Sequence, residues 1–129
     1  MRLIVLFSLL AASCAAAADV FDDRVRLAGA AEADSRYRDY QTAMFQAIGA
    51  ELAGAVNRCV TTTPSPDARP FALVADIDAK GRPRAIDVRP QTNVGRCIAA
   101  AYAKLPFPKP PKLKGRSSVP VVLNMSIAP

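Results

Sequence analysis

Two cysteines, Cys59 and Cys97, are the residues of this chain whose type best suits covalent chemistry. A thiol pair can form a disulfide, bind a metal or supply a nucleophile, and the redox compartment decides among these roles. The chain begins with Arg2, an apolar run at 3–10 and the small-x-small pattern Ala16–Ala18, which is typical of a secretory signal. We therefore expect export to an oxidising compartment, where the two thiols are disulfide candidates.

The expected signal covers residues 1–18, and the mature chain would start at Asp19. Cys14 supports a second interpretation, in which the exported protein is lipidated and tethered to the inner or outer membrane. Ala11 stands three positions before Cys14, where lipoprotein signals usually carry a large aliphatic residue, and Leu10 is four before it. A third interpretation keeps the signal as an uncleaved anchor, although its apolar run is short for a membrane span.

Other side chains that carry chemistry are few. The chain has no His, which removes the usual general base and the commonest zinc ligand. Asp76 and Asp78 lie two apart on a predicted strand, but a calcium site needs more oxygen ligands than this segment offers. We interpret them as an exposed face beside a turn, offset by Arg82 and Arg84 across a hairpin. We expect no catalytic, cofactor-binding or metal-binding residues, and hence no enzyme.

Charge is divided unevenly along the chain. Residues 19–67 carry eight acidic residues and five Arg, whereas residues 69–129 carry eleven Lys or Arg and three Asp. A proline-rich segment concentrates part of the positive charge at Lys109, Lys112, Lys114 and Arg116. Two interpretations stay open: a semi-rigid basic arm for an anionic surface, or a solvated connector that proline keeps extended. Nucleic acid is not an expected partner, because no basic-aromatic motif is present.

Hydrophobic periodicity predicts a helix, two strands, a helix and a strand, in that order. Asp34 is the expected N-cap of the first helix, and Ala79–Arg82 is the expected turn of a hairpin, with a glycine available for positive φ. The expected ranges are 34–59, 71–78, 84–89, 94–104 and 119–127. The first helix is marked by apolar residues at spacings of three and four: Tyr37, Tyr40, Met44, Ile48, Leu52, Val56 and Cys59. We expect one α+β domain over residues 35–129, preceded by an N-terminal extension at 19–34.

Several short motifs occur in a recognisable order. They are the strand and turn at 74–82, the strand at 85–88, the helix at 97–102, the Leu-Pro-Phe-Pro exit at 105–108 and the strand at 120–125. In this order they resemble the carboxy-terminal domain of TonB-type energy transducers. With the two cysteines on the two helices, the chain is most similar to the cysteine-paired AgmX/PglI-like relatives. The resemblance covers residues 43–127.

The resemblance implies a small αββαβ domain, in which two helices pack on a three-stranded antiparallel sheet, and a periplasmic location. It also implies that the domain adds an extended peptide to a sheet edge by β-augmentation. Pro120 favours an edge position for the last strand, whose candidate partner-binding residues are Val119, Val121, Leu123 and Met125. Energy transducers also need a long proline-rich spacer, which this sequence lacks, so we expect a stand-alone, non-catalytic binding module.

Two other functions fit the same observations: a periplasmic inhibitor or immunity-type protein, and a small envelope lipoprotein with a structural role. The expected partner is a protein of the cell envelope, with no cofactor. Membrane contact is expected only through a lipidated Cys14 or the basic arm. Pairing of two sheet edges would give a homodimer.

Overall fold

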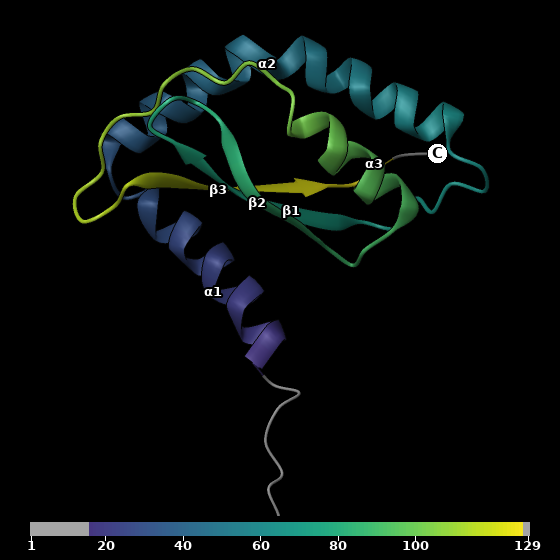
Figure 1. Cartoon of the computed structure of the whole chain (residues 1–129), viewed down its shortest axis with the longest axis horizontal. Helices are drawn as coiled ribbons and strands as arrows, with labels where there is room; N and C mark the ends of the chain where they lie inside the picture. Colours follow the sequence, from purple (N-terminus) through teal and green to yellow (C-terminus); the bar gives the residue numbers. More distant parts are fainter. Residues whose placement is uncertain (1–15, 128–129) are drawn as a thin grey trace, which may run out of the picture.

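The computed structural model describes residues 16–127 (Figure 1). The expected signal up to residue 15, including Cys14, lies outside the described residues. The elements in chain order are α1 (Ala16–Ala31), α2 (Ser35–Thr62), β1 (Phe71–Asp78), β2 (Pro83–Arg89), α3 (Asn93–Tyr102) and β3 (Ser118–Met125). Three helices, a three-stranded antiparallel sheet and one disulfide confirm the predicted α+β class.

The long helix α2 begins where the sequence indicates. The Asp34 carboxylate accepts a hydrogen bond from the Arg36 amide at 2.9 Å, which satisfies one of the free donors of the first turn. The apolar stripe faces the sheet, and its buried members are Tyr37, Tyr40, Met44, Ile48, Leu52 and Cys59. Val56, which the sequence places in the stripe, is only half-buried, and its neighbour Ala55 is buried instead. The helix continues to Thr62 and ends before the proline-rich loop, because proline cannot extend it.

The sheet has the strand order β2-β1-β3, and both pairings are antiparallel. Gly81 turns the β1–β2 hairpin with φ +82°, as the sequence predicts. A Cβ at this position would lie 2.5 Å from the Phe107 carbonyl oxygen, so glycine is also needed for the close approach of the segment after α3. A bulge interrupts the β1–β2 register between Val74 and Asp76, and Ala85 adopts φ +50° opposite it.

The short helix α3 begins at a buried cap. The Thr92 hydroxyl accepts a hydrogen bond from the Gly95 amide at 2.9 Å, and Thr92 is only 2% exposed. Val94, Ile98 and Tyr102 are buried. Asn93 also joins α3 to the loop between α2 and β1, because its side-chain oxygen accepts from the Asp67 amide and its NH2 donates to the Ser65 carbonyl.

The sequence predicts two packing helices, and the structure adds a third. Helix α1 covers the face of the sheet opposite α2 and α3 (Figure 1), so this segment is not merely an extension of the domain. Phe21 and Ala28 are buried, and Val74 on the covered face of β1 is 1% exposed. Arg24 pairs with Asp76 at 3.3 Å. The sequence signal for this helix is the i, i+4, i+7 spacing of the apolar residues Phe21, Val25 and Ala28, which is typical of a helix with one buried face.

Candidate protein-binding edge, basic loop and disulfide

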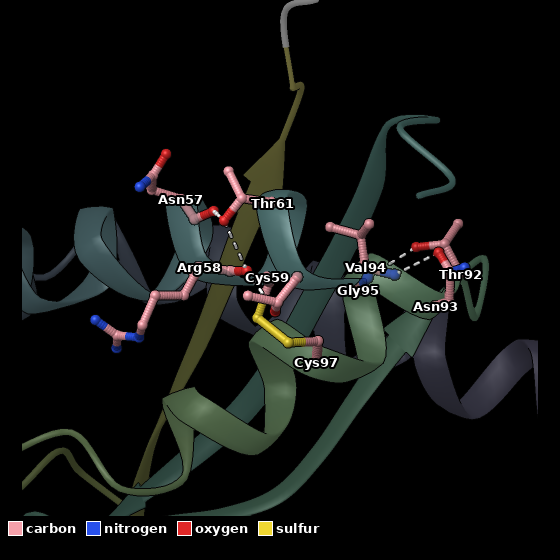
Figure 2. Close-up of a disulfide and its surroundings, with 10 residues drawn as sticks. Asn57, Arg58, Cys59, Thr61, Thr92, Asn93, Val94, Gly95 and Cys97 are labelled. Carbon is pink, nitrogen blue, oxygen red and sulfur yellow. Dashed lines mark hydrogen bonds between the residues drawn. A yellow bond between two sulfur atoms is a disulfide. The ribbon is translucent and has the colours of Figure 1, made fainter. Parts of the chain in front are cut away.

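The disulfide joins the end of α2 to α3. Cys59 and Cys97 are bonded with a Cα–Cα distance of 5.7 Å, which confirms the prediction (Figure 2). Cys59 is 3% exposed, and the Arg58 side chain points away from the bond in Figure 2. The bond closes a loop that contains β1 and β2, so it holds both core helices on the same face of the sheet. Oxidised sulfurs are not nucleophiles, and this role is structural.

The outer edge of β3 is the first candidate site. Asp78 of β1 donates its amide to the Arg82 carbonyl, so the even-numbered residues of β1 point their backbone groups toward β2. Backbone direction alternates along an antiparallel strand, so the odd-numbered residues of β1 pair with β3. Their register partners in β3 are Val119, Val121, Leu123 and Met125. The backbone groups of Pro120, Val122 and Asn124 therefore point away from the sheet.

The first part of this outer edge is closed. Pro120 has no amide proton, and its carbonyl accepts a hydrogen bond of 2.8 Å from the Tyr37 hydroxyl at the start of α2. Helix α1 packs against β3 on the face of the sheet that lies opposite α2. The chain therefore passes around this end of β3 between α1 and α2. Beyond Pro120, the outward groups are the N–H and C=O of Val122 and Asn124. We call residues 122–124 the open edge segment.

The four side chains named from the sequence lie on the core side of this strand. Val119 and Val121 are buried, whereas Leu123 and Met125 are half-buried against the core. These residues orient the strand through packing, and their backbone groups pair with β1. The groups left for a partner belong to the alternate residues Val122 and Asn124. Sequence periodicity could not assign them, because it reports side-chain faces and not the neighbour of each amide.

A hollow lies beside the open edge segment, at the end of the sheet. Its volume is about 260 Å³, and its lining includes Pro70, Phe71, Asn124 and Met125. Arg89 of β2 borders it, with its guanidinium 5.8 Å from the centre of the Phe21 ring. We call it the end hollow. A side chain from a strand added at residues 122–124 would have an apolar wall on one side and a cation on the other.

The carboxylates of the hairpin are occupied by neighbouring donors. Asp78 accepts hydrogen bonds from the Arg82 and Lys80 amides and from the guanidinium groups of Arg82 and Arg84. The Arg82 backbone bond is the main cause that holds the pKa of Asp78 well below its usual range, and the Arg84 side chain adds to it. A carboxylate held ionised in this way is a poor general acid or base. Within residues 16–127, no three His, Cys, Asp or Glu side chains gather closely enough to hold a metal ion.

Two tyrosines anchor the N-terminal half of α2 to other segments. Tyr37 donates to Pro120, and the Tyr40 hydroxyl donates to the Pro108 carbonyl at 2.8 Å. Burial raises the pKa of Tyr37 to about 12 and that of Tyr40 to about 12, so both stay protonated donors at neutral pH. Their part is to position β3 and the segment after α3.

The second candidate site is the basic loop, residues 109–116, which connects α3 to β3. Lys109, Lys112 and Lys114 are exposed, and Arg116 is half-buried. Leu113 lies between two of these lysines and is only 6% exposed, because its side chain joins the core. The Arg116 amide donates to the Leu113 carbonyl around Gly115, which has φ +72°. The loop is therefore folded onto the domain, with its cations outward.

None of the helices in residues 16–127 combines the length and apolar character needed to cross a membrane. Comparison with family models, with curated proteins and with solved structures finds no match to this chain.

Proposed function

We propose that this chain is an exported, non-catalytic protein-binding module of the cell envelope, with a fold like the TonB carboxy-terminal domain. The order α2, β1, β2, α3 and β3, which follows the additional helix α1, and the antiparallel sheet support that fold assignment. The disulfide supports an oxidising compartment such as the periplasm. In this proposal the partner is a protein that presents an extended segment.

One observation carries the proposal: β3 is an edge strand whose second half directs backbone groups outward. Val122 and Asn124 together supply two amides and two carbonyls for an added strand. Each new hydrogen bond contributes a net stabilisation of about 1 kcal/mol, so specificity must come from side chains as well. The end hollow is lined in part by Asn124 and Met125 of β3. In this proposal it receives one side chain of the added strand.

Site-specific photo-crosslinking in living cells tests the proposal. A photoreactive amino acid at the exposed position Asn124 should crosslink to an envelope protein, whereas the same amino acid at the exposed Gln46 on α2 should not. Val122→Pro removes an outward amide and should weaken the crosslink, while Val122→Thr keeps the amide and should preserve it. Equal crosslinking from positions 124 and 46 would contradict the edge assignment.

The identity of the crosslinked species separates the remaining alternatives. A receptor or envelope protein captured through an extended segment supports the proposal. A toxin or hydrolase whose activity falls on binding would assign the inhibitor or immunity-type function instead. A crosslink between two copies of this chain would show that edge pairing makes a homodimer.

A further inference from the structure

A second surface lies at the opposite end of the sheet, where the hairpin turn meets the basic loop. Ala79 and the loop residues Pro110 and Pro111 line a hollow of about 320 Å³, together with Val119 and Ser118 at the start of β3. Lys112 and Arg116 also line it. We call it the loop hollow. Its walls are mainly apolar, and its cations come from the basic loop.

The cations at this end have few acidic neighbours. Within the described residues, the ion pairs near the hairpin turn are those of Asp78 with Arg82 and Arg84, and that of Asp76 with Arg24. Among residues 16–127, no carboxylate lies within ion-pair distance of five further cations, which belong to the hairpin turn and the basic loop. These are Lys80, Lys109, Lys112, Lys114 and Arg116. Such a cluster favours an anionic ligand.

The basic loop is held in place before any ligand arrives. The Tyr40 hydroxyl binds the Pro108 carbonyl, the Arg36 guanidinium donates to the Lys112 carbonyl at 3.3 Å, and Leu113 is inserted into the core. Prolines at 110 and 111 restrict the backbone further. Little backbone freedom remains to be lost on binding, which distinguishes this loop from a free solvated connector.

We propose that the loop hollow and the five surrounding cations form a docking site for a bilayer surface of anionic phospholipid. The phosphate groups lie among Lys112, Arg116 and the neighbouring lysines, and the glycerol end of one lipid contacts the apolar wall at Pro110 and Val119. Clusters of four to eight cations are typical of segments that bind anionic membranes. This site is separate from the open edge segment and does not depend on the proposed function.

The backbone beside the hollow argues for lipid rather than for an acidic peptide. A peptide added here would need outward groups on the first half of β3, but Pro120 lacks an amide and its carbonyl is occupied by Tyr37. Four of the five cations are lysines, which act as point charges and match a diffuse anionic surface without fixed geometry. Lipid headgroups need no backbone partners.

Flotation of the purified chain with vesicles tests this proposal. Vesicles of phosphatidylcholine containing phosphatidylglycerol should bind the protein, and pure phosphatidylcholine vesicles should not. Lys112→Gln with Arg116→Gln should weaken partition about 30-fold, given the usual contribution of a cation near an anionic surface. The matched control, Arg58→Gln with Arg96→Gln, removes two exposed cations of α2 and α3 that do not line the hollows beside the hairpin turn and should cost at most a few-fold. Matching thermal unfolding curves would show that both variants fold.

Three results would overturn the proposal. The first is equal binding to vesicles with and without phosphatidylglycerol. The second is an equal loss in the two double variants, which would show that only net charge matters. The third is displacement from vesicles by polyglutamate or by glycerol phosphate at matched charge concentration, which would assign the site to an acidic protein or to a free phosphate compound. If neither competitor displaces the protein, the result supports binding to the lipid surface.

Discussion

The direction of the β3 backbone is the feature on which the proposed function depends, and proline substitution tests it directly. Val121 directs its amide toward Ala75 of β1, whereas Val122 directs its amide away from the sheet. Val122→Pro removes a donor with no partner in the sheet, at a position where the extended backbone suits proline. Val121→Pro removes a donor inside the sheet and places the ring against β1.

The two substitutions should therefore differ strongly in cost. Val121→Pro leaves the buried Ala75 carbonyl without a donor, which alone costs about 1–3 kcal/mol, and ring clashes add to that. Val122→Pro should lower the free energy of unfolding by about 1 kcal/mol or less, because it breaks no hydrogen bond of the sheet. Pro120 already occupies the equivalent outward position two residues earlier.

Urea unfolding of the oxidised protein measures both costs, and Val122→Thr serves as the control that keeps the amide. Amide hydrogen exchange of the unsubstituted protein gives an independent measure: Val121 and Leu123 should exchange slowly, and Val122 and Asn124 quickly. Equal destabilisation by the two prolines, or slow exchange at Val122, would refute the assigned direction of the strand.

Three further predictions concern the scaffold. Replacing Cys59 and Cys97 together by Ala should cost roughly 4 kcal/mol in the chain-entropy model, since the bond spans 38 positions; an unchanged urea midpoint would show that the bond is dispensable. Tyr37→Phe leaves the buried Pro120 carbonyl unsatisfied and should cost about 1–3 kcal/mol, more than Tyr40→Phe at its less buried bond. Because the pKa of Tyr37 is raised to about 12, its contribution to the free energy of unfolding is complete below about pH 10 and is lost as the pH rises toward 12. The phenolate absorbance of Tyr37 should therefore appear together with unfolding. Titration of Tyr37 near pH 10 in the folded protein would argue against its burial. The pKa of Asp78 is depressed, so its stabilisation is present above about pH 4 and is lost as the pH falls. The urea midpoints of the unsubstituted protein and of Asp78→Asn should therefore converge in acid, while Glu51→Gln should leave the midpoint unchanged at neutral pH.

Much of the fold follows from local patterns in the chain. The N-cap at Asp34, the buried stripe of α2, the positive φ of Gly81 and the pairing of the cysteines all agree with what the residues predict. Each depends on neighbours a few residues apart or, for the cysteines, on the expected compartment. The packing of helix α1 on the sheet is not predicted from the sequence. Its apolar stripe is short, and the face on which it packs is formed by the distant strands β1 and β3.

The sequence by itself determined which faces of α2 and of the strands are buried, because a period of two or of 3.6 residues encodes a face. Only the tertiary structure decided which backbone groups of β3 stay outward, since that depends on strand order and register, to which distant residues contribute. Folding also decided that the basic loop is anchored at Leu113 and lies beside the hairpin turn. Segments far apart in sequence meet there only because the sheet places the start of β3 next to the end of β1.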